Sequence, residues 1–195
     1  MDNVIKNTIK YILEKDKNTG NEVEKKVLNI DKDAIIKKLE NLWAEEKFSW
    51  WIKDNRYDFK SKKLTKFRMM FRTRETYNWN FITLKKRLDN NTEKSKWKCS
   101  IDREFEIKVD NINEIIKNIK ELWMDLIEKK RRVKYRISYE LDWVHFDFDR
   151  YDDIPWFLEI ESDDEKTVNE WIKKLNLQNF PTANYGPRVL EEHYD

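Results

Sequence analysis

Glycine, cysteine and histidine are scarce in this sequence. It has two glycines in 195 residues, Gly20 and Gly186, where average usage would give roughly a dozen. No glycine-rich phosphate-binding loop is present. Cys99 is the only cysteine, which excludes a disulfide framework and a cysteine metal cage. No apolar run approaches membrane length and no signal peptide precedes the first charged residues, so we expect a soluble cytoplasmic protein.

A basic excess is also missing. Lysine and arginine total 40 residues against 38 aspartates and glutamates, and this balance argues against the binding of a nucleic-acid polymer. A hydrophobic content of 39% with three prolines indicates a globular chain. We expect an N-terminal helix and linker over residues 1–20, followed by one domain over residues 21–195.

A pattern of strand, turn and amphipathic helix occurs three times. The copies are EVEKKVLNIDKDAIIKKLENLW (22–43), EFEIKVDNINEIIKNIKELW (104–123) and EIESDDEKTVNEWIKKLNL (159–177). Each copy opens with Glu-x-Glu, and the two-residue period of a strand places both glutamates on one face. Scattered surface charge has no reason to recur at the same place in every copy.

Further strands lie between these copies. Alternation in KFRMMFRTR (66–74), FITLKKR (81–87) and KYRISYELD (134–142) places lysines and arginines on one face and apolar residues on the other. In WVHFDFD (143–149) the polar face carries His145, Asp147 and Asp149, and we expect a structural role for the histidine. An open sheet with a solvated charged face would fit, but the repeated Glu-x-Glu favours an α+β fold with a closed antiparallel β-barrel and flanking helices.

Charge of both signs on one set of faces predicts a particular chemistry. Clustered carboxylates bind a hard divalent cation such as Mg²⁺ or Mn²⁺ through oxygen. Clustered lysines and arginines bind several phosphates. A polyphosphate substrate would need both groups, and the matching reactions are phosphoryl and nucleotidyl transfer.

Six short motifs follow one another along the chain. They are Glu22 and Glu24 with Lys26, FRTR with Arg72 and Arg74, TLK at 83–85, Glu104 with Glu106, Lys134 and Arg136 with Tyr139, and Asp149 followed by FLEIE at 157–161. Lys130, Arg132 and Tyr135 also fit the spacing of the fifth motif. In this order the motifs resemble the CYTH family, also called triphosphate tunnel metalloenzymes, which includes class IV adenylate cyclases and thiamine or inorganic triphosphatases.

The resemblance implies an antiparallel tunnel of about eight strands that holds a triphosphate and Mg²⁺ or Mn²⁺. Its metal ligands would be the carboxylates of Glu22, Glu24, Glu106, Asp149, Glu159 and Glu161. Its substrate-binding residues would be Lys26, Lys66, Arg72, Arg74, Lys85, Glu104, Lys134 and Arg136. Three of these, Lys26, Lys85 and Arg136, would also act in catalysis.

Three functions remain open at this point. The first is a metal-dependent phosphohydrolase acting on ATP, thiamine triphosphate or tripolyphosphate. The second is a class IV-type adenylate cyclase that converts ATP to cyclic AMP and pyrophosphate. The third is a non-catalytic polyphosphate or nucleotide binder, although a pure anion binder gains nothing from so many carboxylates. We expect a monomer or homodimer that binds neither a nucleic-acid polymer nor a membrane.

Nine tryptophans contrast with the two glycines. Trp43 and Trp123 follow predicted helix ends and Trp143 lies in a predicted hairpin turn, places where a left-handed backbone favours glycine. Asn176 occupies the corresponding place in the third copy, and Trp79 follows an asparagine. We hypothesise that several of these tryptophans are UGA codons that the source organism decodes as glycine; tryptophan-rich packing is the alternative.

Overall fold

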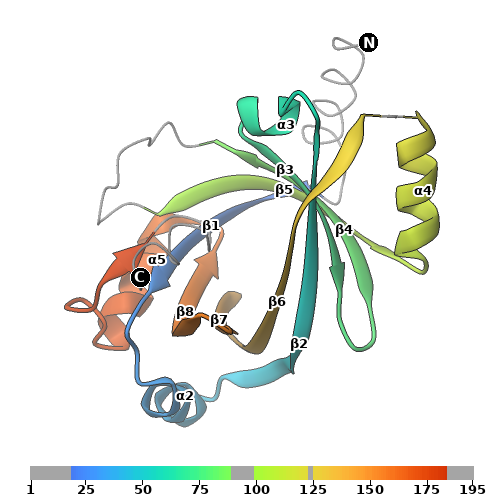
Figure 1. Cartoon of the computed structure of the whole chain (residues 1–195). Helices are drawn as coiled ribbons and strands as arrows, with labels where there is room; N and C mark the ends of the chain where they lie inside the picture. Colours follow the sequence, from blue (N-terminus) through green and yellow to red (C-terminus); the bar gives the residue numbers. More distant parts are fainter. Residues whose placement is uncertain (1–18, 89–98, 123–124, 184–195) are drawn as a thin grey trace. The chain divides into compact units, whose positions relative to one another are not determined.

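The computed structural model describes residues 19–88, 99–122 and 125–183 (Figure 1). Its elements in chain order are β1 (Thr19–Val27), α2 (Lys32–Asn41), β2 (Glu45–Phe59), α3 (Lys63–Lys66), β3 (Met69–Glu75), β4 (Asn80–Arg87), β5 (Ser100–Val109), α4 (Ile112–Leu122), β6 (Leu126–Leu141), β7 (Val144–Tyr151), β8 (Ile154–Ser162), α5 (Glu165–Lys174) and β9 (Thr182–Ala183). The helix expected near the N-terminus lies outside the described residues.

The threefold repeat is confirmed as β1–α2, β5–α4 and β8–α5. A short polar side chain begins each helix by accepting a hydrogen bond from a backbone N–H of the first turn. Asp31 accepts from Ala34 at 3.1 Å, Asn111 from Glu114 at 3.1 Å, and Asp164 from Thr167 at 2.9 Å. Such a cap typically contributes about 1 kcal/mol to helix stability. The same local chemistry therefore separates strand from helix in every copy.

Strand pairing closes the sheet. The hydrogen-bonding order is β5-β4-β3-β2-β6-β7-β8-β1-β9, and β5 also pairs with β1. The pairs β1–β8, β2–β3, β3–β4, β4–β5, β6–β7 and β7–β8 are antiparallel. Eight strands therefore follow one another in a ring, and β9 pairs with β1 at Lys26 and Val27. The predicted α+β fold with a closed antiparallel sheet is confirmed.

Contacts divide the described chain into two compact units. Unit 1 comprises residues 19–21, 52–88, 102–122 and 125–133, and unit 2 comprises residues 22–51, 99–101 and 134–183. Each unit buries its own apolar cluster against its own helices. Figure 1 shows α4 beside β4 in unit 1, and α2 and α5 beside β8 in unit 2. The helices therefore cover the apolar faces of the strands, and the polar faces carry the charged residues.

The core of unit 1 contains strand residues such as Phe71 and Leu84, with Ile112 and Ile116 of α4. In unit 2, Phe146 and Ile160 pack with Leu39 of α2 and with other apolar residues of α2 and α5. Full burial of one such side chain contributes roughly 1.5–3 kcal/mol. Alternation along the strands then places the charged residues on the opposite face.

Two strand predictions need correction. The strand expected at 66–74 begins only at Met69. Residues 63–66 form α3 instead, because Asp58 accepts backbone hydrogen bonds from Leu64 and Thr65. The long strand β2 was not predicted at all, since adjacent apolar residues such as Trp50 and Trp51 obscure its alternation.

Two tryptophans adopt the left-handed backbone that the sequence predicted. Trp43 has φ 67° and Trp143 has φ 63°, and Asn176 has φ 61°. Both indoles are 87% exposed, so packing does not explain them. Trp79 is exposed without a positive φ, and Trp123 lies outside the described residues. Trp43 and Trp143 therefore occupy positions that suit glycine.

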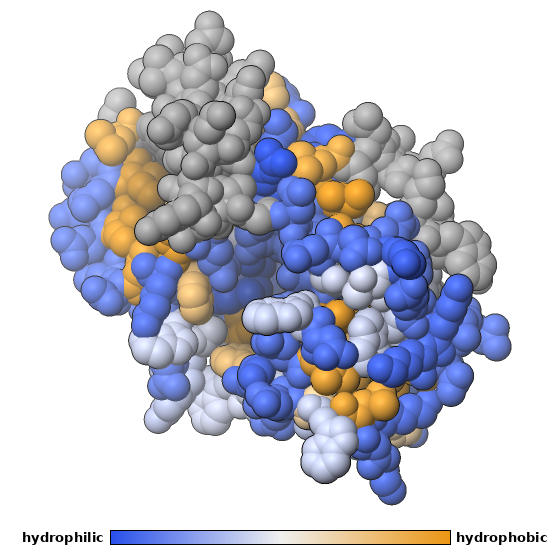
Figure 2. Space-filling view, turned by 180° about the vertical axis from the view of Figure 1, so that it is seen from behind, coloured by the Kyte–Doolittle hydropathy of each residue, from blue (hydrophilic) through white to orange (hydrophobic). Residues whose placement is uncertain are grey.

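The surface is mixed in character. On the face shown in Figure 2, hydrophobic residues form separate groups between hydrophilic ones. Within the part of the chain that the structure describes, no helix has the length and apolar composition needed to cross a membrane.

Candidate functional site

The polar face of unit 1 carries charged residues from four strands. Strand register places Arg72 opposite Thr83, and Thr83 opposite Glu106. It also places Asp54 opposite Arg74. We define the Arg72 cluster as Asp54, Arg72, Arg74, Thr83, Lys85, Glu104 and Glu106.

Arg72 is 7% exposed and lies among three carboxylates of this cluster. Its guanidinium nitrogens are 3.7 Å from Asp54 Oδ2, 3.6 Å from Glu106 Oε2 and 3.9 Å from Glu104 Oε1. At these distances the three carboxylates form ion pairs with Arg72 without hydrogen bonds. Arg72 also donates hydrogen bonds from Nε and Nη2 to Thr83 Oγ1 at 3.4 and 3.3 Å. Arg74, in contrast, donates to both oxygens of Asp54, at 2.9 and 3.2 Å.

The remaining members of the Arg72 cluster form short contacts. Lys85 forms an ion pair with Glu104, its partner in the β4–β5 register. Thr83 donates its hydroxyl hydrogen to Glu106 at 2.6 Å. The cluster therefore combines three cations and three carboxylates on adjacent strands, as a site that exchanges internal ion pairs for phosphate oxygens would require.

The polar face of unit 2 carries a second group of charged residues. Lys26 lies opposite Glu159, and Glu159 lies opposite Asp147. Asp149 lies opposite Arg136 on β6. We define the Arg136 cluster as Glu24, Lys26, Lys134, Arg136, Ser138, Asp147, Asp149 and Glu159.

Contacts in the Arg136 cluster are short. Arg136 donates from Nε to Asp149 Oδ1 at 2.6 Å, and its terminal nitrogens pair with Asp147, Asp149 and Glu159. Lys134 also donates to Asp149, which is 1% exposed. Every described cation in the cluster is therefore directly paired with a carboxylate.

The ammonium of Lys26 lies between two carboxylates. Its Nζ is 2.7 Å from Glu24 Oε1 and 2.7 Å from Glu159 Oε1. Ser100 donates to the same oxygen of Glu24 at 3.1 Å. The ammonium group of Lys26 thus lies where carboxylates of β1 and β8 converge.

Burial and charge act in opposite directions on the pKa values of this cluster. Burial lowers the pKa of Lys26, but the carboxylates of Glu159 and Glu24 raise it above its ordinary value. Burial raises the pKa of Glu159, but Lys26 and Arg136 bring it well below its ordinary value. At Asp149 burial prevails over Arg136 and Lys134, so its pKa is raised. Asp149 and Glu159, two of the three carboxylates that pair with Arg136, therefore differ in their affinity for a proton.

The predicted metal ligands divide between the units. Glu24 and Glu161 are direct partners in the β1–β8 register, and Glu22 is a buried residue of the same strand. Glu106 belongs to the Arg72 cluster instead. Over residues 19–88, 99–122 and 125–183, no three aspartates, glutamates, histidines or cysteines are arranged to hold a metal ion.

The predicted phosphate-binding residues fall mainly in the two clusters. Lys66 is not in either cluster, because it is the last residue of α3 and is exposed. Its contact with phosphate was predicted from a strand that begins only at Met69, and that contact stays a prediction. The structure favours Lys134 over Lys130 for the fifth motif, since Lys134 is buried against Asp149 and Lys130 is exposed. His145 is exposed and lies 3.9 Å from Glu140.

Two carboxylates of the clusters were not predicted as site residues. Asp54 was missed with β2, although the alternation of Asp54, Arg56 and Asp58 with Tyr57 and Phe59 carries the signal. The sequence predicted that Asp147 lies on the polar face of its strand, but it predicted no metal-binding or phosphate-binding role for this residue. It accepts hydrogen bonds from Ser138 and Arg136.

Comparison with known proteins relies on structure alone, because no family model and no curated protein matches the sequence. The PH1012 protein of Pyrococcus horikoshii is similar at a TM-score of 0.68 and 22% identity, covering 87% of this chain and 98% of that one. A proposed adenylate cyclase from Vibrio parahaemolyticus is similar at a TM-score of 0.68 and 15% identity, covering 89% and 98%. HpAC1 of Hippeastrum, proposed as an adenylyl cyclase and found to have a dominant triphosphatase activity, gives a TM-score of 0.62 and 11% identity over 89% and 95%.

The chain has the fold of these proteins. The architecture that its motifs implied through their resemblance to the CYTH family is confirmed. At these identities the likeness extends to the fold alone, because one fold hosts many activities.

Proposed function

We propose that the protein is a divalent-metal-dependent phosphohydrolase that acts on an organic or inorganic triphosphate. The observation that carries this proposal is a set of buried cations, each held among carboxylates on the polar face of a strand. Burial without a paired charge would be costly, so such groups are retained where their charge is used or compensated.

Phosphate binding is assigned to the cations of both clusters. Arg72 and Arg74 offer planar guanidinium groups, which match phosphate oxygens in pairs, and Lys85 adds a point charge. In the Arg136 cluster, Lys26, Lys134 and Arg136 have the same capacity. Cations that are already positioned stabilise the charge that develops on phosphate oxygens during transfer.

The carboxylates of β1 and β8 have the chemistry to bind a hard divalent cation, which would have to draw them together because no three of the described carboxylates are arranged to hold a metal ion. They supply only oxygen ligands, which Mg²⁺ and Mn²⁺ prefer. The ammonium of Lys26 between Glu24 and Glu159 shows that a positive charge is accommodated there. Glu22, Glu24, Glu159 and Glu161 would hold the ion, which when bound would polarise phosphate oxygens. Displaced from these carboxylates, Lys26 would then be available to bind phosphate.

Hydrolysis is placed ahead of cyclisation for two reasons. HpAC1, which has the same fold, has a dominant triphosphatase activity although it was proposed as a cyclase. Cyclisation also needs a site for the adenine base, and the two clusters consist of groups suited to phosphate and metal. The cyclase reading keeps support from the proposed adenylate cyclase of Vibrio parahaemolyticus.

Product analysis tests this proposal. The full chain is incubated with ATP, thiamine triphosphate or tripolyphosphate, with Mg²⁺ or Mn²⁺ and with a chelator as the control. Orthophosphate with a diphosphate supports the hydrolase, and cyclic AMP with pyrophosphate selects the cyclase. Tight binding of a triphosphate without turnover would support the non-catalytic binder instead of the enzyme.

Arg72→Ala tests the assignment of phosphate binding. Removing one charge-assisted contact should weaken tripolyphosphate binding by about 1.5–3 kcal/mol, measured by titration calorimetry. Lys86→Ala is the matched control, because Lys86 is an exposed cation on β4 outside the Arg72 cluster. An unchanged dissociation constant for Arg72→Ala would remove Arg72 from the site.

A further inference from the structure

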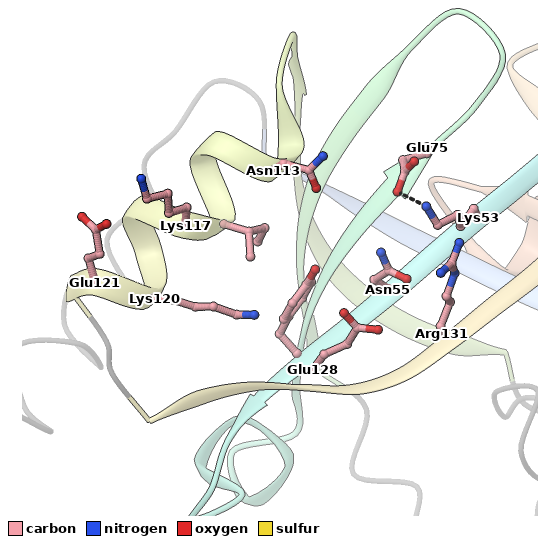
Figure 3. A pocket seen from close by; sticks show the side chains of 11 residues that line it. Lys53, Asn55, Glu75, Asn113, Lys117, Lys120, Glu121, Glu128 and Arg131 are labelled. Carbon is pink, nitrogen blue, oxygen red and sulfur yellow. Dashed lines mark ion pairs between the residues drawn. The ribbon is translucent and has the colours of Figure 1, made fainter.

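A cavity lies in unit 1 on the other side of the sheet from the Arg72 cluster. Asn55 and Tyr57 line it, and along β2 they alternate with Asp54, so they face the opposite side. Figure 3 shows α4 forming one wall and β2 and β6 the other. The volume is about 870 Å³, within the range of small-molecule sites, which is roughly 300–1,000 Å³.

Asn55 gives the first indication of a ligand. Its side chain is only 9% exposed, yet its Oδ1 has no hydrogen-bond partner among the described residues. A buried acceptor without a donor is unfavourable, and native proteins rarely retain one without a reason. A ligand that brings an N–H or O–H group into the cavity would satisfy it.

Charge gives the second indication. The lining holds four cationic and three acidic side chains. One pair is already neutralised, since Lys53 lies 2.7 Å from Glu75 (Figure 3). Lys120 extends from α4 toward Tyr57, with its Nζ 5.8 Å from the centre of the ring, and Arg131 lines the cavity from β6. The Glu128 carboxylate lies between these two cations (Figure 3), so an anionic group on the α4 side would meet Lys120.

Apolar surface gives the third indication. Tyr57 is 6% exposed and Ile116 is 7% exposed, and both line the cavity from the core of unit 1. Together the cavity offers an apolar floor, an acceptor that lacks a donor, and cations at its walls. Inorganic phosphate would satisfy only the cations.

We propose that this cavity binds a nucleoside monophosphate. Its phosphate contacts Lys120, and an N–H group of its base donates to Asn55 Oδ1. The base covers the apolar surface of Tyr57 and Ile116. This site lies outside both charged clusters and does not depend on the function proposed for them.

Titration calorimetry on the full chain tests the site with AMP, ribose 5-phosphate and inorganic phosphate as probes. AMP should bind about tenfold more tightly than ribose 5-phosphate, the equivalent of one further hydrogen bond. The variant Lys120→Ala should weaken AMP binding at least about tenfold, and Lys86→Ala should not change it. Arg72→Ala should bind AMP as the wild type does, which separates this site from the Arg72 cluster.

Asn55→Leu isolates the recognition of the base. Leucine keeps the size of the side chain and removes the acceptor, so AMP should lose its advantage over ribose 5-phosphate. The melting temperature without ligand should not fall, because an unpaired buried acceptor is removed. Absence of AMP binding at millimolar concentration, equal binding of AMP and inorganic phosphate, or loss of AMP binding in Arg72→Ala would each overturn the proposal.

Discussion

The Arg72 and Arg136 clusters contain the same residue types, but their central arginines lie at different distances from the surrounding carboxylates. Arg72 stands 3.6–3.9 Å from three carboxylates, whereas Arg136 makes direct hydrogen bonds with Asp147, Asp149 and Glu159. The Arg72 cluster has as many carboxylates as cations. The Arg136 cluster has four carboxylates for three cations, and Glu22 and Glu161 add two more acids on β1 and β8.

Under the proposed function, this difference predicts a different role for each cluster. A cation with longer contacts to its carboxylates can exchange those contacts for phosphate oxygens more readily than a cation that is bonded to three carboxylates and mainly holds them in place. The acidic excess around the Arg136 cluster is suited to a metal ion. We therefore expect substitutions at the two arginines to have different consequences.

Stability should show the largest effect. Arg136→Ala leaves Asp147, Asp149 and Glu159 without their shared partner, and breaking a buried pair of this kind costs about 3–5 kcal/mol. Arg72→Ala should lose less, because its contacts with carboxylates are longer. Urea unfolding of both variants checks this comparison, with the exposed Arg150→Ala as the control. Equal losses at the two arginines would show that the clusters do not differ in energy.

Metal binding should distinguish the clusters next. Mn²⁺ at one hundred times its dissociation constant should stabilise the wild type by about 2.7 kcal/mol, seen as a higher melting temperature. Glu161→Gln should lose most of this gain, because it weakens a ligand beside Glu24. Glu106→Gln is the matched control in the Arg72 cluster and should keep the gain. Loss of the shift in both variants would mean that the ion is not confined to unit 2.

Acid should reveal a smaller effect at Glu159. Its pKa is lowered by Lys26 and Arg136, so its stabilising contribution is complete above the ordinary glutamate pKa of about 4.3 and is lost as the pH falls through the lower folded value. The stability difference between wild type and Glu159→Gln should therefore be constant near neutrality and shrink below about pH 4. Unfolding curves from pH 7 to pH 3 measure it. A difference that does not change with pH would contradict the ionised state of Glu159.

The smallest effect concerns positions outside both clusters. Trp43→Gly and Trp143→Gly should each stabilise the protein by roughly 1 kcal/mol, because glycine adopts a positive φ without the steric cost that tryptophan carries. Thermal unfolding checks this, with Trp79→Gly as a control that should not stabilise. The codons at 43 and 143 test the decoding hypothesis separately: UGA supports it and UGG refutes it.

Alternation and repetition made most of the fold predictable from sequence. The Glu-x-Glu strands, their helices and the basic strand at 81–87 follow directly from residue spacing. Lys66 was misplaced because its helix depends on hydrogen bonds to Asp58, which lies several residues before the helix begins. The neighbours of Arg136 could not be predicted, because they are set by the register of β6, β7 and β8, and a shift of one residue would turn every side chain to the other face.

Pairing between the two ends of the chain has a consequence for the order of folding. β3, β4 and β5 are consecutive and pair with their neighbours in sequence, so the Arg72 cluster can form early and locally. β1 pairs with β5 as well as with β8, and it must wait for β8 before Glu24 meets Glu161. At a synthesis rate of roughly 5–20 residues per second, β1 emerges from the ribosome about ten seconds before β8. The two lysines of β1 balance its two glutamates, so during that interval no net charge repulsion keeps this strand apart from copies of itself.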